Sequence, residues 1–157
     1  MGSERTEKPT RFSTVSITAA QAPLRGRLRF PGDKSLSIRR ALLTLFTDHD
    51  TTLENYGSGE DCLTALYCLK QLGKSIERSG ARALIKGRFE NRHAALDCRN
   101  SGTTARLLMG ILSGIEGEWV LSGDESLSSR PMARVAAPLR EMGAAIELTN
   151  GRLPARI

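Results

Sequence analysis

Three short segments of the sequence combine small or hydroxyl residues with a cation at the predicted start of a helix. They are residues 32–39 (Gly-Asp-Lys-Ser-Leu-Ser-Ile-Arg), 100–106 (Asn-Ser-Gly-Thr-Thr-Ala-Arg) and 128–132 (Ser-Ser-Arg-Pro-Met). The first turn of a helix has free backbone N–H groups and the positive end of the helix dipole, so it attracts phosphates and carboxylates. Glycine lets a ligand approach the backbone, and arginine can hold an anion through two parallel hydrogen bonds. Together the segments predict a site for a ligand with more than one anionic group.

Each segment also has a purely structural explanation. Asp33 and Asn100 are suited to cap helices, Gly102 permits close packing, and Arg130 alone is most simply a surface arginine. The Gly-x-Lys-Ser sequence at 32–35 is a weak motif by itself, because it lacks the second glycine of a nucleotide-binding P-loop. The occurrence of three such segments in one chain favours the anion site.

The sequence shows no motif for nucleophilic, acid–base or metal-dependent chemistry. His49 and His93 fall in predicted loops without a serine or cysteine partner, and Glu60-Asp61 is interpreted as a helix cap rather than an acid–base couple. The three cysteines, Cys62, Cys68 and Cys98, show neither a CxxC pair nor zinc-ligand spacing. We therefore expect reduced thiols, no metal site and a cytoplasmic protein.

The charge balance narrows the possible partners. The 157 residues include 23 Lys and Arg against 17 Asp and Glu, a net charge of +6, which favours anionic partners. The aromatic content of 4% and the scattered basic residues disfavour a nucleic-acid reader. No apolar run approaches membrane-spanning length, and the polar start of the chain is unlike a signal peptide. Small anionic molecules are the expected partners, and no membrane partner is expected.

The hydrophobic spacing predicts two copies of a β-α-β-α-β-β unit, which makes the fold class α/β (α+β). A mobile tail (1–13) and a lead-in strand (14–24, with its best candidate at 15–19) precede a first unit at 25–88 and a second at 92–157. The first unit has predicted strands at 27–30, 51–55, 74–78 and 83–86 and helices at 35–46 and 61–72. The second has strands at 95–98, 119–121, 144–148 and 153–157 and helices at 101–112 and 131–142. Leu72-Gly73 and Met142-Gly143 recur at an offset of 70 residues, and each anion-binding segment begins or precedes a predicted helix.

The sequence resembles the 5-enolpyruvylshikimate-3-phosphate (EPSP) synthase family. The resemblance lies in Pro-Gly-Asp-Lys-Ser-Leu-Ser at 31–37, in residues 96–110, and in Gly-Asp-Glu-Ser-Leu at 123–127 with Arg-Pro-Met at 130–132. It extends from about Pro23 to the last residue. The related UDP-N-acetylglucosamine enolpyruvyl transferases share the fold but differ in these signature residues. The resemblance implies part of an incomplete inverse α/β barrel-like domain, with a third unit and a second domain absent.

The resemblance also implies a reaction and a set of substrate contacts. The family transfers the enolpyruvyl group of phosphoenolpyruvate to the 5-hydroxyl of shikimate 3-phosphate, releases phosphate, and uses no metal or organic cofactor. Lys34 would contact both substrates, and Ser35 and Arg39 would hold shikimate 3-phosphate. Gly102 and Arg130 would line the phosphoenolpyruvate site, with Asn100 and Thr103 close by. A side chain larger than that of Gly102 would disfavour glyphosate at this position.

The chain departs from the family in three residues and in length. Arg99 stands where glycine is common, Ile38 where a polar residue is usual, and Arg40 where alanine is usual. The general acid and base are expected in sequence beyond this chain, so we expect no catalytic residue here and no activity without the remainder of the enzyme or a complementing chain. The alternatives are a non-catalytic anion-binding module derived from the family and, on net charge alone, a nucleic-acid-binding protein.

Overall fold

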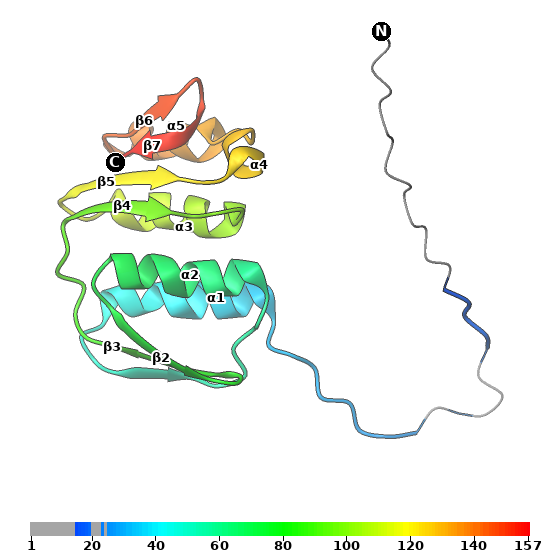
Figure 1. Ribbon diagram of the computed structural model, residues 1–157. Helices are drawn as coiled ribbons and strands as arrows, with labels where there is room; N and C mark the ends of the chain where they lie inside the picture. The colour runs from blue at the N-terminus through cyan, green and yellow to red at the C-terminus, as the bar shows by residue number, and fades with distance from the viewer. Residues whose placement is uncertain (1–14, 20–22, 24) are drawn as a thin grey trace, which may run out of the picture.

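Two open sheets enclose a layer of helices in the computed structural model, which describes residues 15–19, 23 and 25–157. The helices are α1 (Lys34–Leu43), the 3-10 helix η1 (Thr44–Phe46), α2 (Glu60–Gln71), α3 (Gly102–Leu112), α4 (Glu125–Ser128) and α5 (Ala133–Glu141). The strands are β1 (Thr51–Leu53), β2 (Ser75–Ser79), β3 (Arg82–Lys86), β4 (His93–Asp97), β5 (Glu118–Ser122), β6 (Glu147–Thr149) and β7 (Arg152–Arg156). Figure 1 shows α1 and α2 between the first sheet and strand β4 of the second, with α3 level with β4 and below β5 in this view.

The two sheets share one strand pattern, as the predicted repeat requires. The first has the order β1-β3-β2 with antiparallel pairs, and the second has the order β4-β5-β7-β6. In the second sheet β5-β7-β6 repeats the first sheet's arrangement, and β4 adds a parallel strand beside β5. The β6–β7 hairpin turns at Asn150 and Gly151, both with left-handed φ (52° and 74°), which is the conformation that an Asn-Gly hairpin favours. Neither sheet closes into a barrel within the described residues.

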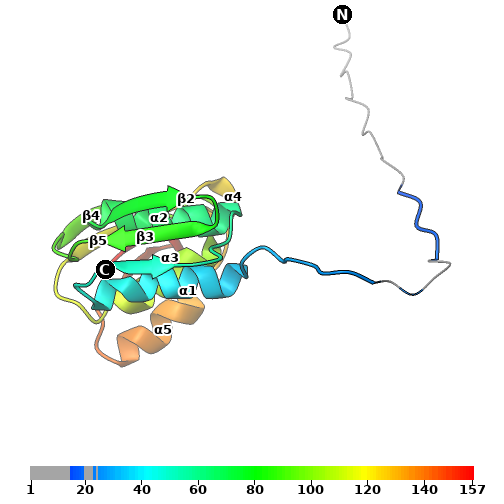
Figure 2. The same cartoon turned by 90° about the horizontal axis from the view of Figure 1, so that it is seen from below.

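The segment before α1 differs from the prediction. Residues 15–19 and 27–30 form no strand, contrary to the expected lead-in strand and first strand of unit one, and the predicted tail 1–13 lies outside the described residues. A strand needs a partner edge for its N–H and C=O groups, and residues 25–30 run away from the sheets (Figures 1 and 2). Their apolar side chains accordingly remain exposed, at 80% for Leu28 and 75% for Phe30.

Two helix boundaries also differ. The predicted helix at 35–46 is divided into α1 and η1, and the one at 131–142 begins at Ala133, so Pro131 precedes the helix instead of occupying its first position. The four-residue helix α4 is absent from the prediction because it is too short for hydrophobic periodicity to show.

One continuous core holds the helices and sheets together. Its largest fully buried side chains come from both units: Ile38, Leu42, Leu69, Leu72, Ile85, Leu96, Leu108, Met109, Leu112, Trp119, Leu121 and Leu127. Ile38 is fully buried, which explains an apolar residue at that position. The core fixes α1, α2 and α3 side by side with their N-termini at the same end of the molecule, beside α4 (Figure 1).

A buried lysine, Lys74, ties two loops to the end of α2. Its side-chain nitrogen donates hydrogen bonds to the carbonyls of Thr47 (2.8 Å) and Gly87 (2.7 Å). Burial lowers the pKa of Lys74, against the opposing attraction of Asp48 and Asp50. The lysine therefore serves as a hydrogen-bond donor that joins the chain before β1 to the chain after β3.

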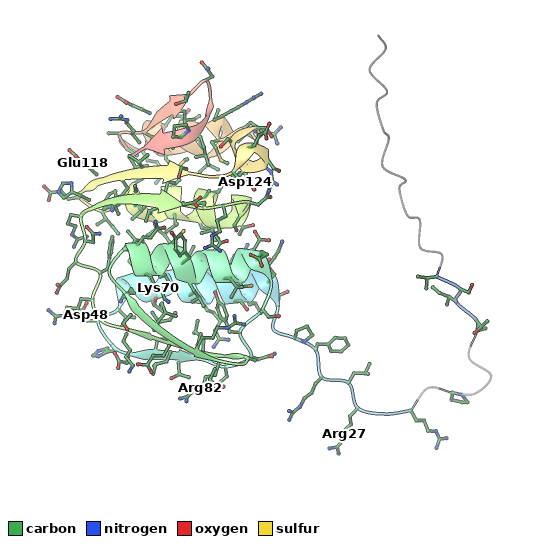
Figure 3. The ribbon with its side chains drawn as sticks, in the orientation of Figure 1. Arg27, Asp48, Lys70, Arg82, Glu118 and Asp124 are labelled. Carbon is green, nitrogen blue, oxygen red and sulfur yellow. The ribbon has the colours of Figure 1, made fainter. Side chains whose placement is uncertain are left out.

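Lys74→Met is expected to destabilise the fold by about 2 kcal/mol, because two carbonyls lose their donor. That loss corresponds to a melting temperature about 4–8 °C lower in a thermal denaturation followed by circular dichroism. Lys70→Met is the matched control, since Lys70 lies exposed on α2 (Figure 3) and its replacement is expected to change stability by less than about 0.5 kcal/mol. Equal melting temperatures for the two variants would refute the tethering role.

Candidate anion-binding site

The start of α1 is held by its own cap and by the loop after β1. The Asp33 carboxylate accepts the backbone N–H of Leu36 at 2.7 Å, which confirms the predicted cap. Gly32 packs so closely that an added Cβ would lie 1.8 Å from the carbonyl oxygen of Asn55. The Ser37 hydroxyl also accepts the N–H of Gly57 at 2.9 Å. The close approach that Gly32 permits is therefore to another backbone segment, and it fixes where Lys34 begins the helix.

Lys34 pairs with Asp61 across the α1–α2 contact. The side-chain nitrogen lies 3.2 Å from the Asp61 carboxylate. Burial acts to raise the pKa of Asp61, but hydrogen bonding with Ser101 and Lys34 and the charges of Lys34 and Arg130 together lower it. The predicted capping role of Glu60-Asp61 is wrong: Gly59 occupies the N-cap without a side-chain hydrogen bond, and Asp61 instead pairs with Lys34 of α1.

The start of α3 brings two guanidinium groups beside a buried glycine. Ser101, not Asn100, is the N-cap, and its side chain accepts the N–H of Thr104. An added Cβ on Gly102 would lie 2.5 Å from Nη1 of Arg106 and 3.3 Å from Nη1 of Arg130. The absence of a side chain at Gly102 therefore leaves space that both cations border.

Arg130 follows α4 and is held by a short network. Its Nη2 donates to Oδ1 of Asn100 (2.6 Å) and to the Ser126 hydroxyl (3.2 Å). Asn100 in turn donates to Oδ2 of Asp124 at 2.7 Å, and the other Asp124 oxygen accepts the N–H of Leu127 at 2.7 Å. Hydrogen bonds from the Leu127 N–H and from Asn100 lower the pKa of Asp124.

The structure thus brings together four of the predicted site residues, Lys34, Asn100, Gly102 and Arg130. Ser35 lies next to Lys34 in the first turn of α1, Arg39 one turn later, and Thr103 in the first turn of α3. In the described part of the chain these last three make no hydrogen bond or ion pair with the cluster. A hollow of about 360 Å³ borders the cluster, lined by residues of α2, the loop before α3 and Asp124.

Two residues of this cluster, Asp61 and Asp124, were not expected to contribute. Each pairs with a residue more than 20 positions away, Asp61 with Lys34 and Asp124 with Asn100. Such contacts depend on how the helices pack, and no local pattern identifies them. The nearest indication in the sequence is that each carboxylate lies at or near the start of a helix.

A larger hollow lies elsewhere. It has a volume of about 830 Å³ and is lined by residues of β4, β5 and the segment around Ile146, including Trp119 and Ile157. Its lining includes Arg140 and Arg156 but also Glu118 and Glu147, so neither size nor the presence of arginine alone identifies the anion site.

The other candidate chemical groups do not form a site. Among the described residues no cluster of His, Cys, Asp and Glu could hold a metal ion. The three cysteines are buried and free, and hydrogen bonding to Cys68 and burial raise the pKa of Cys98. His93 is exposed and lies 3.7 Å from Glu118 without a nucleophile. No helix in residues 15–19, 23 and 25–157 combines the length and hydropathy needed to cross a bilayer.

Arg99, the most conspicuous departure from the family pattern, lines the hollow beside the cluster and stacks on α2. Its backbone has a left-handed φ of 48°, a conformation that glycine adopts without strain. Its guanidinium lies 4.5 Å from the ring centroid of Tyr67 on α2, a cation–π contact. The arginine side chain is therefore accommodated by stacking on the Tyr67 ring at the edge of this hollow. Arg40 is exposed on α1 and borders a small hollow with Asp33 and Glu54.

Comparisons with known proteins identify relatives of this chain. The family model for EPSP synthase (3-phosphoshikimate 1-carboxyvinyltransferase) matches residues 18–157. A 3-phosphoshikimate 1-carboxyvinyltransferase of Desulfitobacterium hafniense (strain DSM 10664 / DCB-2) is 49% identical over 127 residues, which cover 78% of this chain and 29% of the relative. The protein of that name from Thermoanaerobacter sp. (strain X514) is 44% identical over 131 residues, covering 82% of this chain and 31% of the relative.

Solved structures give the same result. The EPSP synthase from Acinetobacter baumannii superimposes with a TM-score of 0.75 at 39% identity, over 84% of this chain and 32% of that structure. The chain thus spans about 30% of the length of the relatives it matches.

Proposed function

We propose a function from the premise that the chain belongs to the EPSP synthase family. The chain supplies part of the substrate site of an enzyme that transfers the enolpyruvyl group of phosphoenolpyruvate to the 5-hydroxyl of shikimate 3-phosphate with release of phosphate. The observation that carries the proposal is the convergence of Lys34, Arg106 and Arg130 on the N-termini of α1 and α3. Both substrates carry a phosphate and a carboxylate, the groups that such a cluster binds.

Each residue has a substrate-binding role that corresponds to its place in the fold. Lys34, at the α1–α2 contact, binds both substrates, while Ser35 and Arg39 on α1 bind shikimate 3-phosphate. Gly102 and Arg130 line the phosphoenolpyruvate side, with Asn100 and Thr103 next to them. These roles are supported by the Lys34–Asp61 ion pair and by the Arg130–Asn100 hydrogen bond, both at the same end of the helix layer.

The catalytic acid and base belong to the remainder of the enzyme or to a complementing chain. Loss of such groups typically lowers a rate by about 10²–10⁴-fold, and loss of substrate positioning costs more. The chain alone is therefore expected to bind substrates without converting them, in the cytoplasm. The relatives' names favour this function over a free-standing anion-binding module.

Isothermal titration of the chain with shikimate 3-phosphate, and separately with phosphoenolpyruvate, tests the proposal. Weak saturable binding is expected for both, and the Lys70→Met variant, which removes an exposed cation at the end of α2 opposite Asp61, is expected to bind equally well. A chain that is folded by circular dichroism yet takes up neither substrate would contradict the proposed function.

A further inference from the structure

A chain of hydrogen bonds runs from Asp124 through Asn100 to Arg130. Oδ2 of Asp124 accepts from Nδ2 of Asn100 at 2.7 Å, and Oδ1 of Asn100 accepts from Nη2 of Arg130 at 2.6 Å. The Ser126 hydroxyl accepts from the same nitrogen at 3.2 Å. The three main members come from three places in the chain: the loop before α3, the N-cap of α4 and the residue before Pro131.

The hydrogen-bonding types permit only one orientation of the Asn100 amide. An ionised carboxylate only accepts and a guanidinium only donates, so the amide must present its NH₂ to Asp124 and its oxygen to Arg130. The reverse orientation would lose both bonds. The hydrogen bonds from Leu127 and Asn100 that lower the pKa of Asp124 favour the ionised form that the arrangement requires.

The network uses one end of the guanidinium and leaves the other end facing Gly102. Nη2 carries both bonds of the network, whereas Nη1 has no hydrogen-bond partner among the described residues. Nη1 is the atom that would lie 3.3 Å from a Cβ on Gly102. The fixed end thus sets the direction in which the free end can meet an anion.

We propose that Asp124 is a positioning residue, which acts through Asn100 to aim the free Nη1 of Arg130 at the anion beside Gly102. The proposal rests on the proposed function, because that function supplies phosphoenolpyruvate as the anion. In this role Asp124 does not touch the substrate. It determines the orientation of the Asn100 amide, which in turn determines the orientation of the Arg130 guanidinium.

Asp124→Asn separates this role from the capping of α4. The new side-chain oxygen can still accept the N–H of Leu127, so the cap is retained. The new NH₂ group faces Asn100, where an acceptor stood before. The Asn100 amide then either loses its hydrogen bond to residue 124 or rotates so that its oxygen accepts that bond. In the rotated orientation its NH₂ group faces the Arg130 guanidinium, so that two hydrogen-bond donors oppose each other.

The direction of the effect distinguishes positioning from simple electrostatics. Removing a negative charge next to Arg130 would, through charge alone, strengthen the binding of an anion. The positioning role predicts the opposite, an affinity for phosphoenolpyruvate lowered about tenfold by loss of one charge-assisted contact. Glu125→Gln is the matched control, because it removes a neighbouring exposed carboxylate that takes no part in the network.

A double-mutant cycle with Arg130→Met tests the proposal by titration of the full chain with phosphoenolpyruvate. Asp124→Asn is expected to weaken binding about tenfold in the wild-type background and to have no further effect once Arg130 is replaced. Binding that stays equal or becomes tighter in Asp124→Asn, or an equal loss in both backgrounds, would overturn the proposal.

A second measurement without substrate keeps this test independent of the proposed function. In nitrogen-15 NMR the Arg130 guanidinium protons are expected to exchange slowly with water in the wild type and fast in Asp124→Asn, while Glu125→Gln resembles the wild type. Equal exchange in wild type and Asp124→Asn would refute the positioning role, whereas slow exchange without substrate binding would count only against the proposed function.

Discussion

Lys34→Met is expected to lower the affinity of the chain for shikimate 3-phosphate and for phosphoenolpyruvate at least about 100-fold. The ammonium supplies charge-assisted hydrogen bonds, each contributing about 1.5–3 kcal/mol. The substitution also leaves the Asp61 carboxylate, now without its 3.2 Å partner, close to the incoming anion. Loss of attraction and gain of repulsion therefore act in the same direction.

The fold is expected to withstand this change. The Lys34 side chain is 59% exposed, and exposed ion pairs contribute about 0–1 kcal/mol to stability. Isothermal titration measures the binding, and circular dichroism checks the fold. The double variant Lys34→Met/Asp61→Asn serves as the control: with the repulsion removed, it is expected to bind more tightly than Lys34→Met alone. Unchanged affinity in Lys34→Met would exclude Lys34 from the site.

Gly32→Ala is expected to destabilise the protein by about 3 kcal/mol, a strong effect for one methyl group. The added Cβ would lie 1.8 Å from the carbonyl oxygen of Asn55 and 2.8 Å from the backbone nitrogen of Gly57. Backbone atoms cannot rotate aside, so the start of α1 must move away from the loop after β1. The Lys34–Asp61 pair would move with it, and substrate binding is expected to fall as well.

Chemical denaturation measures this loss, and Gly110→Ala provides the matched control. Gly110 lies exposed within α3 with no atom within 4 Å of an added Cβ. Alanine there is expected to stabilise the helix by about 0.5–1 kcal/mol. If Gly32→Ala unfolded at the same denaturant concentration as the wild type, the tight contact between residues 32 and 55 would be contradicted.

Local rules located the longer helices, but the caps expected at Asn100 and Glu60-Asp61 were wrong. The spacing of apolar residues identified the helices, Asp33 was predicted as a cap, and Asn150-Gly151 marked the last hairpin. These features depend on residues within a few positions of one another, so the sequence displays them directly. The three cationic helix starts were found in the same way.

Contacts between distant residues could not be predicted. Asp61 and Asp124 join the site only because α1, α2 and α3 pack side by side, which places Lys34 next to Asp61 and Asn100 next to Asp124. Gly32 was expected to admit a ligand, but it admits the backbone of Asn55. The strand expected at 27–30 does not form. Its local pattern suits a strand, but no partner strand lies beside it in the described chain.

Mapping of amide shifts in nitrogen-15 NMR during titration with shikimate 3-phosphate tests the central claim most directly. The account predicts that the shifting amides cluster in the first turns of α1 and α3, around Lys34, Ser35 and residues 100–103, with a smaller response at Arg130. Figure 3 places Asp124, which belongs to the same cluster, at this end of the molecule. Shifts confined to the larger hollow around Trp119 and Ile157, or no shifts at saturating ligand, would contradict the account.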